Sequence, residues 1–171
     1  MDVQSESLSN QRMAVFGFDR VSRLSTAVQK LQIPTEAWAM TDGIAIRQAA
    51  DGPRRLAPCL VATVRSGQAQ LGVLRGLMAD ADGSLKAKLD WYGGTIEAYR
   101  LQQPGLREHK LPRIAVFLLS EGQQMSLLIP SNAPIRPGIG IALEGPFIQH
   151  LVPIEVVERG IDFVRYSCRP G

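Results

Sequence analysis

The sequence predicts a mostly β protein (α+β), in which an antiparallel meander of β-hairpins forms a barrel or a sandwich. Beyond Pro34, apolar residues alternate with polar ones, which is the period of a half-buried strand. Turn residues separate these short segments at intervals of about 8–12 residues, as in sandwiches and barrels. Before Pro34 the period is helical, so the prediction includes one N-terminal amphipathic helix packed on the sheet.

The helical segment comes first along the chain. Four apolar residues recur at the spacing of one helix face: Val21, Leu24, Val28 and Leu31. Asp19 or Ser22 can cap the start of this helix, and Pro34 ends it by restricting the residue before it. We expect the helix to cover one side of a sheet, and the alternative is a helix that binds a partner.

Three later segments have the pattern of a hairpin. Their turns are Ser66-Gly67, Gly93-Gly94 and Glu121-Gly122. The first turn aligns three apolar pairs on one face: Leu60 with Val73, Ala62 with Leu71 and Val64 with Ala69. Polar residues, among them Thr63 and Gln70, occupy the other face. A shift of one residue would mix the two faces, so the register is specified.

The second hairpin has the strongest local signal. Gly-Gly suits a type I′ turn, which needs a positive φ at both central residues. This register places Asp90 opposite Glu97 on an outer face. The same face combines basic and aromatic side chains, namely Lys86, Lys88, Tyr92 and Tyr99. Together with Arg54 and Arg55, these residues are a candidate face for a ligand or a nucleic acid, because single strands bind aromatic side chains among basic ones.

The third hairpin is apolar on both faces. Its turn aligns Ile114, Val116 and Leu118 with Ile129, Leu127 and Met125. The reverse face carries Phe117 and Leu119, and a strand pair apolar on both sides lies inside a fold or at an interface. Phe117 and Leu119 are therefore candidate partner-binding residues, with Ile135 and Arg136 of the Pro-rich loop that follows. Further on, Pro153 predicts an edge strand or a bulge.

Two regions of the chain differ in composition. Residues 1–12 are polar and are expected to form a flexible tail. Residues 13–171 are expected to form a single β-rich domain, because their number suits one domain. The polar start is unlike a secretory signal, and no apolar run is long enough for a membrane span, so a cytoplasmic protein is expected.

Composition and motifs exclude several chemistries. The net charge is +3 and the basic residues are scattered, whereas nucleic-acid-binding proteins usually concentrate them. The two cysteines and two histidines lack the short spacing of a zinc site. No G-x-S-x-G or phosphate-loop motif is present. We expect no metal, no cofactor and no catalytic residue, apart from Asp90 and Glu97 as an acid–base pair. The sequence does not decide whether Cys59 and Cys168 are free or paired.

These observations favour a non-enzymatic binding or assembly module, a subunit or accessory protein of a larger bacterial complex. Such a module would contact a protein partner, or a second copy, through a β-sheet face and the N-terminal tail. Two alternatives remain open: a small nucleic-acid-binding β-barrel, and a small-molecule-binding protein or small enzyme that uses Asp90 and Glu97.

Overall fold

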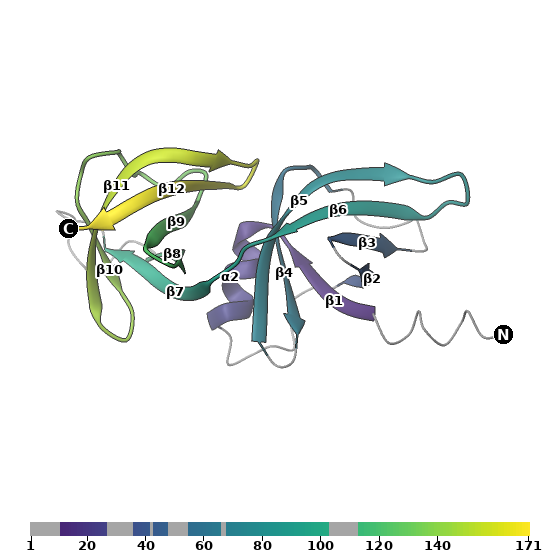
Figure 1. Ribbon diagram of the computed structural model, residues 1–171, viewed down its shortest axis with the longest axis horizontal. Coiled ribbons are helices and arrows are strands. Elements are labelled where there is room, and N and C mark those ends of the chain that lie inside the picture. The colour runs from purple at the N-terminus through teal and green to yellow at the C-terminus, as the bar shows by residue number, and fades with distance from the viewer. Residues whose placement is uncertain (1–10, 27–35, 42, 48–54, 66–67, 103–112) are drawn as a thin grey trace. The chain divides into compact units, whose positions relative to one another are not determined.

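The chain forms two closed antiparallel β-barrels of six strands each (Figure 1). The computed structural model describes residues 11–26, 36–41, 43–47, 55–65, 68–102 and 113–171. One barrel lies in the unit Met1–Tyr92 and the other in the unit Gly93–Gly171. The predicted fold class, mostly β with one N-terminal helix, is confirmed, and the barrel is the correct alternative. That residues 13–171 fold as one domain stays a prediction.

The first barrel contains strands β1 to β6 and the helix α2. Their bounds are β1 Gln11–Phe16, α2 Phe18–Thr26, β2 Glu36–Thr41, β3 Ile44–Arg47, β4 Cys59–Arg65, β5 Gln68–Ala79 and β6 Leu85–Trp91. The strand order is β1-β2-β3-β6-β5-β4, and pairing of β4 with β1 closes the barrel. The expected flexible tail falls mostly outside the described residues, although β1 already includes its last two residues.

The second barrel contains strands β7 to β12. Their bounds are β7 Thr95–Gln102, β8 Ile114–Glu121, β9 Gln124–Pro130, β10 Ile141–Glu144, β11 Ile148–Arg159 and β12 Phe163–Pro170. The order is β10-β11-β12-β9-β8-β7, and β7 pairs with β10 to close the barrel. Read in the opposite direction and numbered from its own first strand, this order is 1-2-3-6-5-4, the same as in the first barrel.

Each barrel has its own apolar interior. The first is filled around the aromatic residues Phe16 and Trp38, whose ring centroids are 5.8 Å apart. The second is filled mainly by aliphatic residues from all six strands, with Tyr99 and Tyr166 among them. Along the strands, residues that point into the core alternate with residues that point outward, as expected for a small barrel.

The helix α2 packs against β1 and β4 of the first barrel. It begins after Gly17, which has a φ of +91° and accepts a hydrogen bond from the backbone N–H of Val21. Asp19 and Ser22 therefore lie inside the first turns, and the prediction that one of them caps the helix is wrong. The rest of the predicted helix lies outside the described residues. No helix of the described chain is long and apolar enough to cross a membrane.

The first predicted hairpin is confirmed as β4–β5, with the register Leu60–Val73, Ala62–Leu71 and Val64–Ala69. Its polar face, however, is not solvated. Thr63 lies on the same side as Cys59 and Val61, which belong to the barrel interior, and it is fully buried. Its hydroxyl donates a hydrogen bond to the backbone oxygen of Met13, so the buried polar group is satisfied.

The second predicted hairpin does not form, and that prediction is wrong. Strand β6 pairs with β5 and β3, whereas β7 pairs with β8 and β10. The two glycines serve close packing within the second barrel. A β-carbon at Gly94 would lie 2.1 Å from the backbone oxygen of Ser120, and one at Gly93 would lie 2.9 Å from Glu121 Oε1. The Gly-Gly pair reflects this contact with the end of β8, and not a turn.

The third predicted hairpin forms as β8–β9, but its register is shifted by two residues. Leu118 pairs with Leu127 instead of Met125, and the loop is Gly122-Gln123. A shift of two keeps every side chain on its predicted face. The predicted irregularity at Pro153 is confirmed as a register shift in the pairing of β11 with β12.

Candidate functional site

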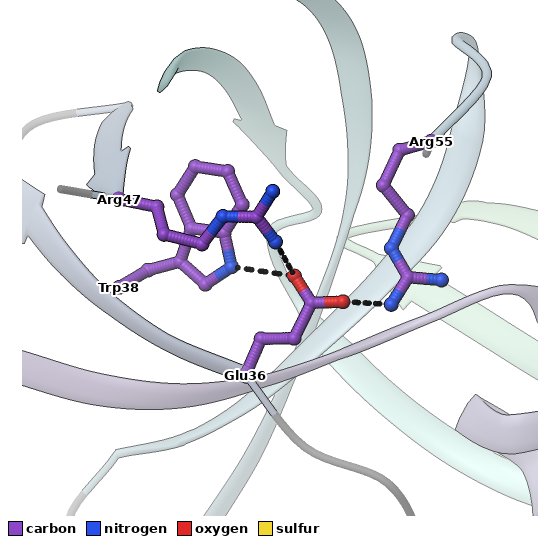
Figure 2. A network of polar contacts seen from close by, with 4 residues as sticks. All are labelled: Glu36, Trp38, Arg47 and Arg55. Atoms are coloured by element: carbon purple, nitrogen blue, oxygen red, sulfur yellow. Dashed lines mark hydrogen bonds and ion pairs between the residues drawn. The ribbon is translucent and has the colours of Figure 1, made fainter. Parts of the chain in front are cut away.

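A network of ionised side chains lies at one mouth of the first barrel (Figure 2). Glu36 begins β2, Arg47 ends β3 and Arg55 precedes β4, so three separate segments supply the charges. Because side chains alternate along a strand, Glu36 shares its side of β2 with Trp38, which is fully buried in the barrel interior. The network therefore covers the aromatic core.

The Glu36 carboxylate accepts hydrogen bonds at both oxygens. Arg47 Nη1 donates to Oε2 at 2.7 Å, and Trp38 Nε1 lies 3.3 Å from the same oxygen. Arg55 Nη2 donates to Oε1 (Figure 2). The guanidinium groups also lie over aromatic rings, Arg47 at 5.1 Å from the Trp38 centroid and Arg55 at 5.0 Å from that of Phe16. Such stacking adds a cation–π attraction to each ion pair.

The network carries more positive than negative charge. Burial lowers the pKa of the Arg55 guanidinium, and the neighbouring charge of Arg20 lowers it further. Arginine nonetheless stays protonated at neutral pH. Among the described residues, Arg55 Nε has no hydrogen-bond partner. Because both oxygens of Glu36 accept hydrogen bonds from side chains of this barrel, we assign the network to the closure of the barrel.

A second candidate is a groove of about 630 Å³ in the first barrel, along β3, β5 and β6. Its lining combines apolar and basic side chains, chiefly Ile44, Leu77, Met78, Lys86 and Lys88, with Gly76. A volume of this size is in the range of ligand-binding clefts. Lys86 and Lys88 are two of the residues predicted to form a ligand or nucleic-acid face.

The described residues among the others predicted for that face do not line this groove. Tyr99 is buried in the core of the second barrel, where its hydroxyl lies 3.3 Å from Glu97 Oε2 and 3.2 Å from Gln149 Oε1. Burial raises the pKa of Tyr99, and the charge of Glu97 raises it further. Tyr92 follows β6, Arg55 belongs to the barrel mouth, and Arg54 lies outside the described residues.

The strand pairing that was predicted to place Asp90 opposite Glu97 is absent. Asp90 pairs with Val73 across β5–β6 and binds Arg75 at 2.7 Å, whereas Glu97 pairs with Leu118 across β7–β8. The two residues were placed opposite one another only by the Gly93-Gly94 hairpin, which is absent. The acid–base hypothesis for Asp90 and Glu97 therefore loses the register that suggested it, and it stays a prediction.

The predicted partner-binding residues have different surroundings. Phe117 and Leu119 lie on the face of β8 opposite the core residues Val116 and Leu118, and both are buried. Ile135 packs in the core of the second barrel, whereas the neighbouring Arg136 is exposed. A role of these four residues in partner binding stays a prediction.

Exposed apolar side chains of the second barrel concentrate on and beside β11. We call this set the β11 surface: Phe147, Ile148, Ile154, Val156, Val157 and Ile161. Phe147 precedes the strand and is 61% exposed, and Ile161 follows it and is 51% exposed. Two register shifts in the pairing with β12 interrupt the strict alternation of this strand. Consecutive residues such as Val156 and Val157 are therefore both exposed.

The described residues hold no cluster of three metal-ligating side chains. Cys59 and Cys168 carry reduced thiols, each buried in the core of a different barrel. Burial raises the pKa of the Cys168 thiol to about 11. Such a thiol is a weak nucleophile at neutral pH, because the thiolate is the reactive form.

The fold defines a protein of two tandem β-barrels with the same strand order. Compared with known proteins, the chain matches no family model, no curated protein and no solved structure. The arguments for function therefore rest on the geometry of its own side chains.

Sequence reasoning missed Glu36, Trp38 and Arg47. The sequence does contain a signal that points to these residues. It is the Asp42-Gly43 dipeptide, which is typical of a two-residue hairpin turn between two segments of alternating apolar and polar residues. Strands β2 and β3 do pair on either side of it, with Thr41 opposite Ile44. Extending this register places Arg47 beside Trp38 and near Glu36, so three members of the network were accessible from the sequence.

Proposed function

We propose that this protein is a non-enzymatic binding or assembly module, a subunit or accessory protein of a larger bacterial complex. The observation that carries the proposal is the β11 surface, six large apolar side chains exposed on and beside one strand of the second barrel. Exposed apolar side chains that adjoin one another commonly mark sites of protein–protein contact, and Ile154, Val156 and Val157 fall within four consecutive residues of β11. The partner is another protein or a second copy of this chain, and a cytoplasmic location stays a prediction.

The charges flanking this surface support a protein partner. Glu155 and Arg159 are exposed on the same strand, so one acidic and one basic group lie among the apolar residues. An apolar centre with a polar rim is the usual composition of a protein interface. A nucleic acid would need a basic surface instead, because phosphate contacts dominate its affinity.

The test combines association in solution with capture in the cell. We expect sedimentation velocity to show concentration-dependent association, or photo-crosslinking from position 156 in the native host to give one adduct of defined mass. A Val156→Ser, Ile161→Ser variant should lose the association or adduct, and a crosslinker at the exposed Arg100 should give none. A compact monomer at high concentration, with no adduct from position 156, would contradict the proposal.

A further inference from the structure

We propose that the groove on the first barrel is a separate docking site for an extended segment of a protein partner, in which apolar side chains flank one acidic side chain. This site lies on β3, β6 and β5 and shares no residue with the β11 surface. The inference therefore goes beyond the proposed function and can fail or succeed independently of it.

A missing side chain leaves open space in this groove, and we call the space beside Gly76 the hollow. The pairing registers place Ile44, Lys88 and Gly76 in one row across the three strands. A β-carbon built at Gly76 would meet no atom within 4 Å, so the space beside Lys88 is open. Gly76 is not among the glycines with a positive φ, so its backbone conformation does not require glycine. The glycine therefore leaves room for a side chain of a bound segment.

Apolar side chains flank this hollow. The next row contains Ile46, Lys86 and Met78, by the same registers. Ile44, Ile46 and Met78 are all exposed, Met78 at 58%. Residues two apart on a strand are spaced by about 7 Å. An extended segment has the same spacing between side chains on one face, so its alternate residues can contact both rows.

The groove also has a basic centre. Lys86 Nζ lies 3.3 Å from Asp80 Oδ2, and Arg75 Nε lies 2.7 Å from Asp90 Oδ2, so these four charges are balanced. Lys88 is exposed and makes no ion pair among the described residues. One uncompensated positive charge beside the hollow favours an acidic group in the bound segment.

The same ion pairs argue against other occupants. The apolar part of the groove is only about two rows long, because ion-paired side chains border it at either end. A long acyl chain would extend over those charges. A nucleic acid would place its phosphates near Asp80 and Asp90, which repel them. A short segment with one acidic and several apolar side chains fits the charges best.

The experiment selects binders to the full chain from a random peptide library displayed on phage. We expect enrichment of sequences in which apolar residues alternate with one Asp or Glu. The variant Lys88→Glu should lower the affinity of these peptides by about fivefold, and selection on that variant should enrich Lys or Arg instead. Gly76→Leu should abolish the enrichment because its side chain fills the hollow.

A matched control is Gly140→Leu in the second barrel. A β-carbon there has Leu151 O as its nearest neighbour, at 4.0 Å, so the change adds the same side chain away from the groove. It should leave binding unchanged. Enriched peptides without an acidic residue, binding insensitive to Lys88→Glu, or no enrichment over an uncoated surface would overturn the proposal.

A competing oligonucleotide separates the remaining alternative. Single-stranded DNA that binds at low salt and loses binding in Lys88→Glu would overturn the peptide proposal in favour of a polyanion. If circular dichroism shows that Gly76→Leu does not fold, the selection on Lys88→Glu still tests the proposal. A reversed charge preference of the enriched peptides would support it, and an unchanged preference would overturn it. The selection is repeated with the Val156→Ser, Ile161→Ser variant, so that failure of the β11 surface is distinguished from failure of the groove.

Discussion

Strand for strand, the first and second barrels follow the same order, yet their interiors are built from different side chains. The first packs Trp38 against Phe16 and closes its mouth with Glu36 between two arginines. The second is mainly aliphatic, and one of its buried polar groups is the Tyr99 hydroxyl, which lies beside Glu97 and Gln149. One strand order is thus compatible with an ionic closure and with a nearly neutral core. The comparison predicts that the two barrels respond to different substitutions.

The largest effect is expected from Glu36→Gln. This change removes the carboxylate charge that pairs with both guanidinium groups of the network, which should lower the free energy of unfolding by about 3–5 kcal/mol. Both tryptophans, Trp38 and Trp91, lie in the first barrel, so their fluorescence in a urea titration reports on it. The control is Asp19→Asn, which removes an exposed ion pair with Arg23 and should cost under about 1 kcal/mol.

A loss similar to that of the control would contradict a stabilising role for the network. Amide exchange in β8 and β9 measures the second barrel in the same variant. Unchanged protection there would show that the barrels unfold separately, whereas a parallel loss would support a single domain over residues 13–171.

Gly94→Ala should destabilise the second barrel and lower its free energy of unfolding by about 3 kcal/mol. Its β-carbon would overlap the Ser120 oxygen, and its φ is +74°. Gly122→Ala is the matched control, because its φ is +61° but no atom lies within 4 Å of the added carbon. Gly122→Ala should lower the free energy of unfolding by only about 1 kcal/mol, because it adds the strain of a positive φ without a steric clash. Equal losses, measured by thermal unfolding of both variants, would show that the contact with Ser120 does not matter.

The Cys168 thiol should make the second barrel sensitive to high pH. Burial raises its pKa from 9.0 to about 11, so the folded state retains a proton that the unfolded state releases. The contribution of this thiol to stability is complete below pH 9. Between pH 9 and about 11 the free energy of unfolding should fall by about 2 kcal/mol as this contribution is lost. The check compares urea unfolding of the wild type and Cys168→Ala across this range. Parallel curves for the two proteins would rule the effect out.

The smallest effect is expected from Tyr99→Phe. Removing the hydroxyl near Glu97 and Gln149 should lower the free energy of unfolding by about 1 kcal/mol. The raised pKa of Tyr99 offers a second readout, because an ultraviolet titration of this variant should lose a late step that the wild type shows. A titration with the same late step in wild type and variant would assign the raised pKa to another tyrosine.

The sequence predicted the structure where local and long-range requirements agreed. The β4–β5 register followed from the position of its turn and from one apolar face, which a shift of one residue would have mixed with the polar face. Gly93 and Gly94 led to a wrong hairpin prediction because glycine occurs both in tight turns and where another backbone segment approaches closely. Here the approaching segment contains Ser120, which is distant in the sequence. The same limit applies to the site: Lys86 and Lys88 were found from their strand, but the hollow beside them depends on Gly76 across the sheet.

The contiguity of each barrel in the sequence bears on how the protein is made. The closing pair of the first barrel joins Phe16 to Val61, and its last strand ends at Trp91. Every strand of that barrel therefore leaves the ribosome before β7 begins at Thr95. The first barrel can complete its sheet during translation, because none of its strands needs a partner from the second barrel. This limits the time for which unpaired strand edges can aggregate.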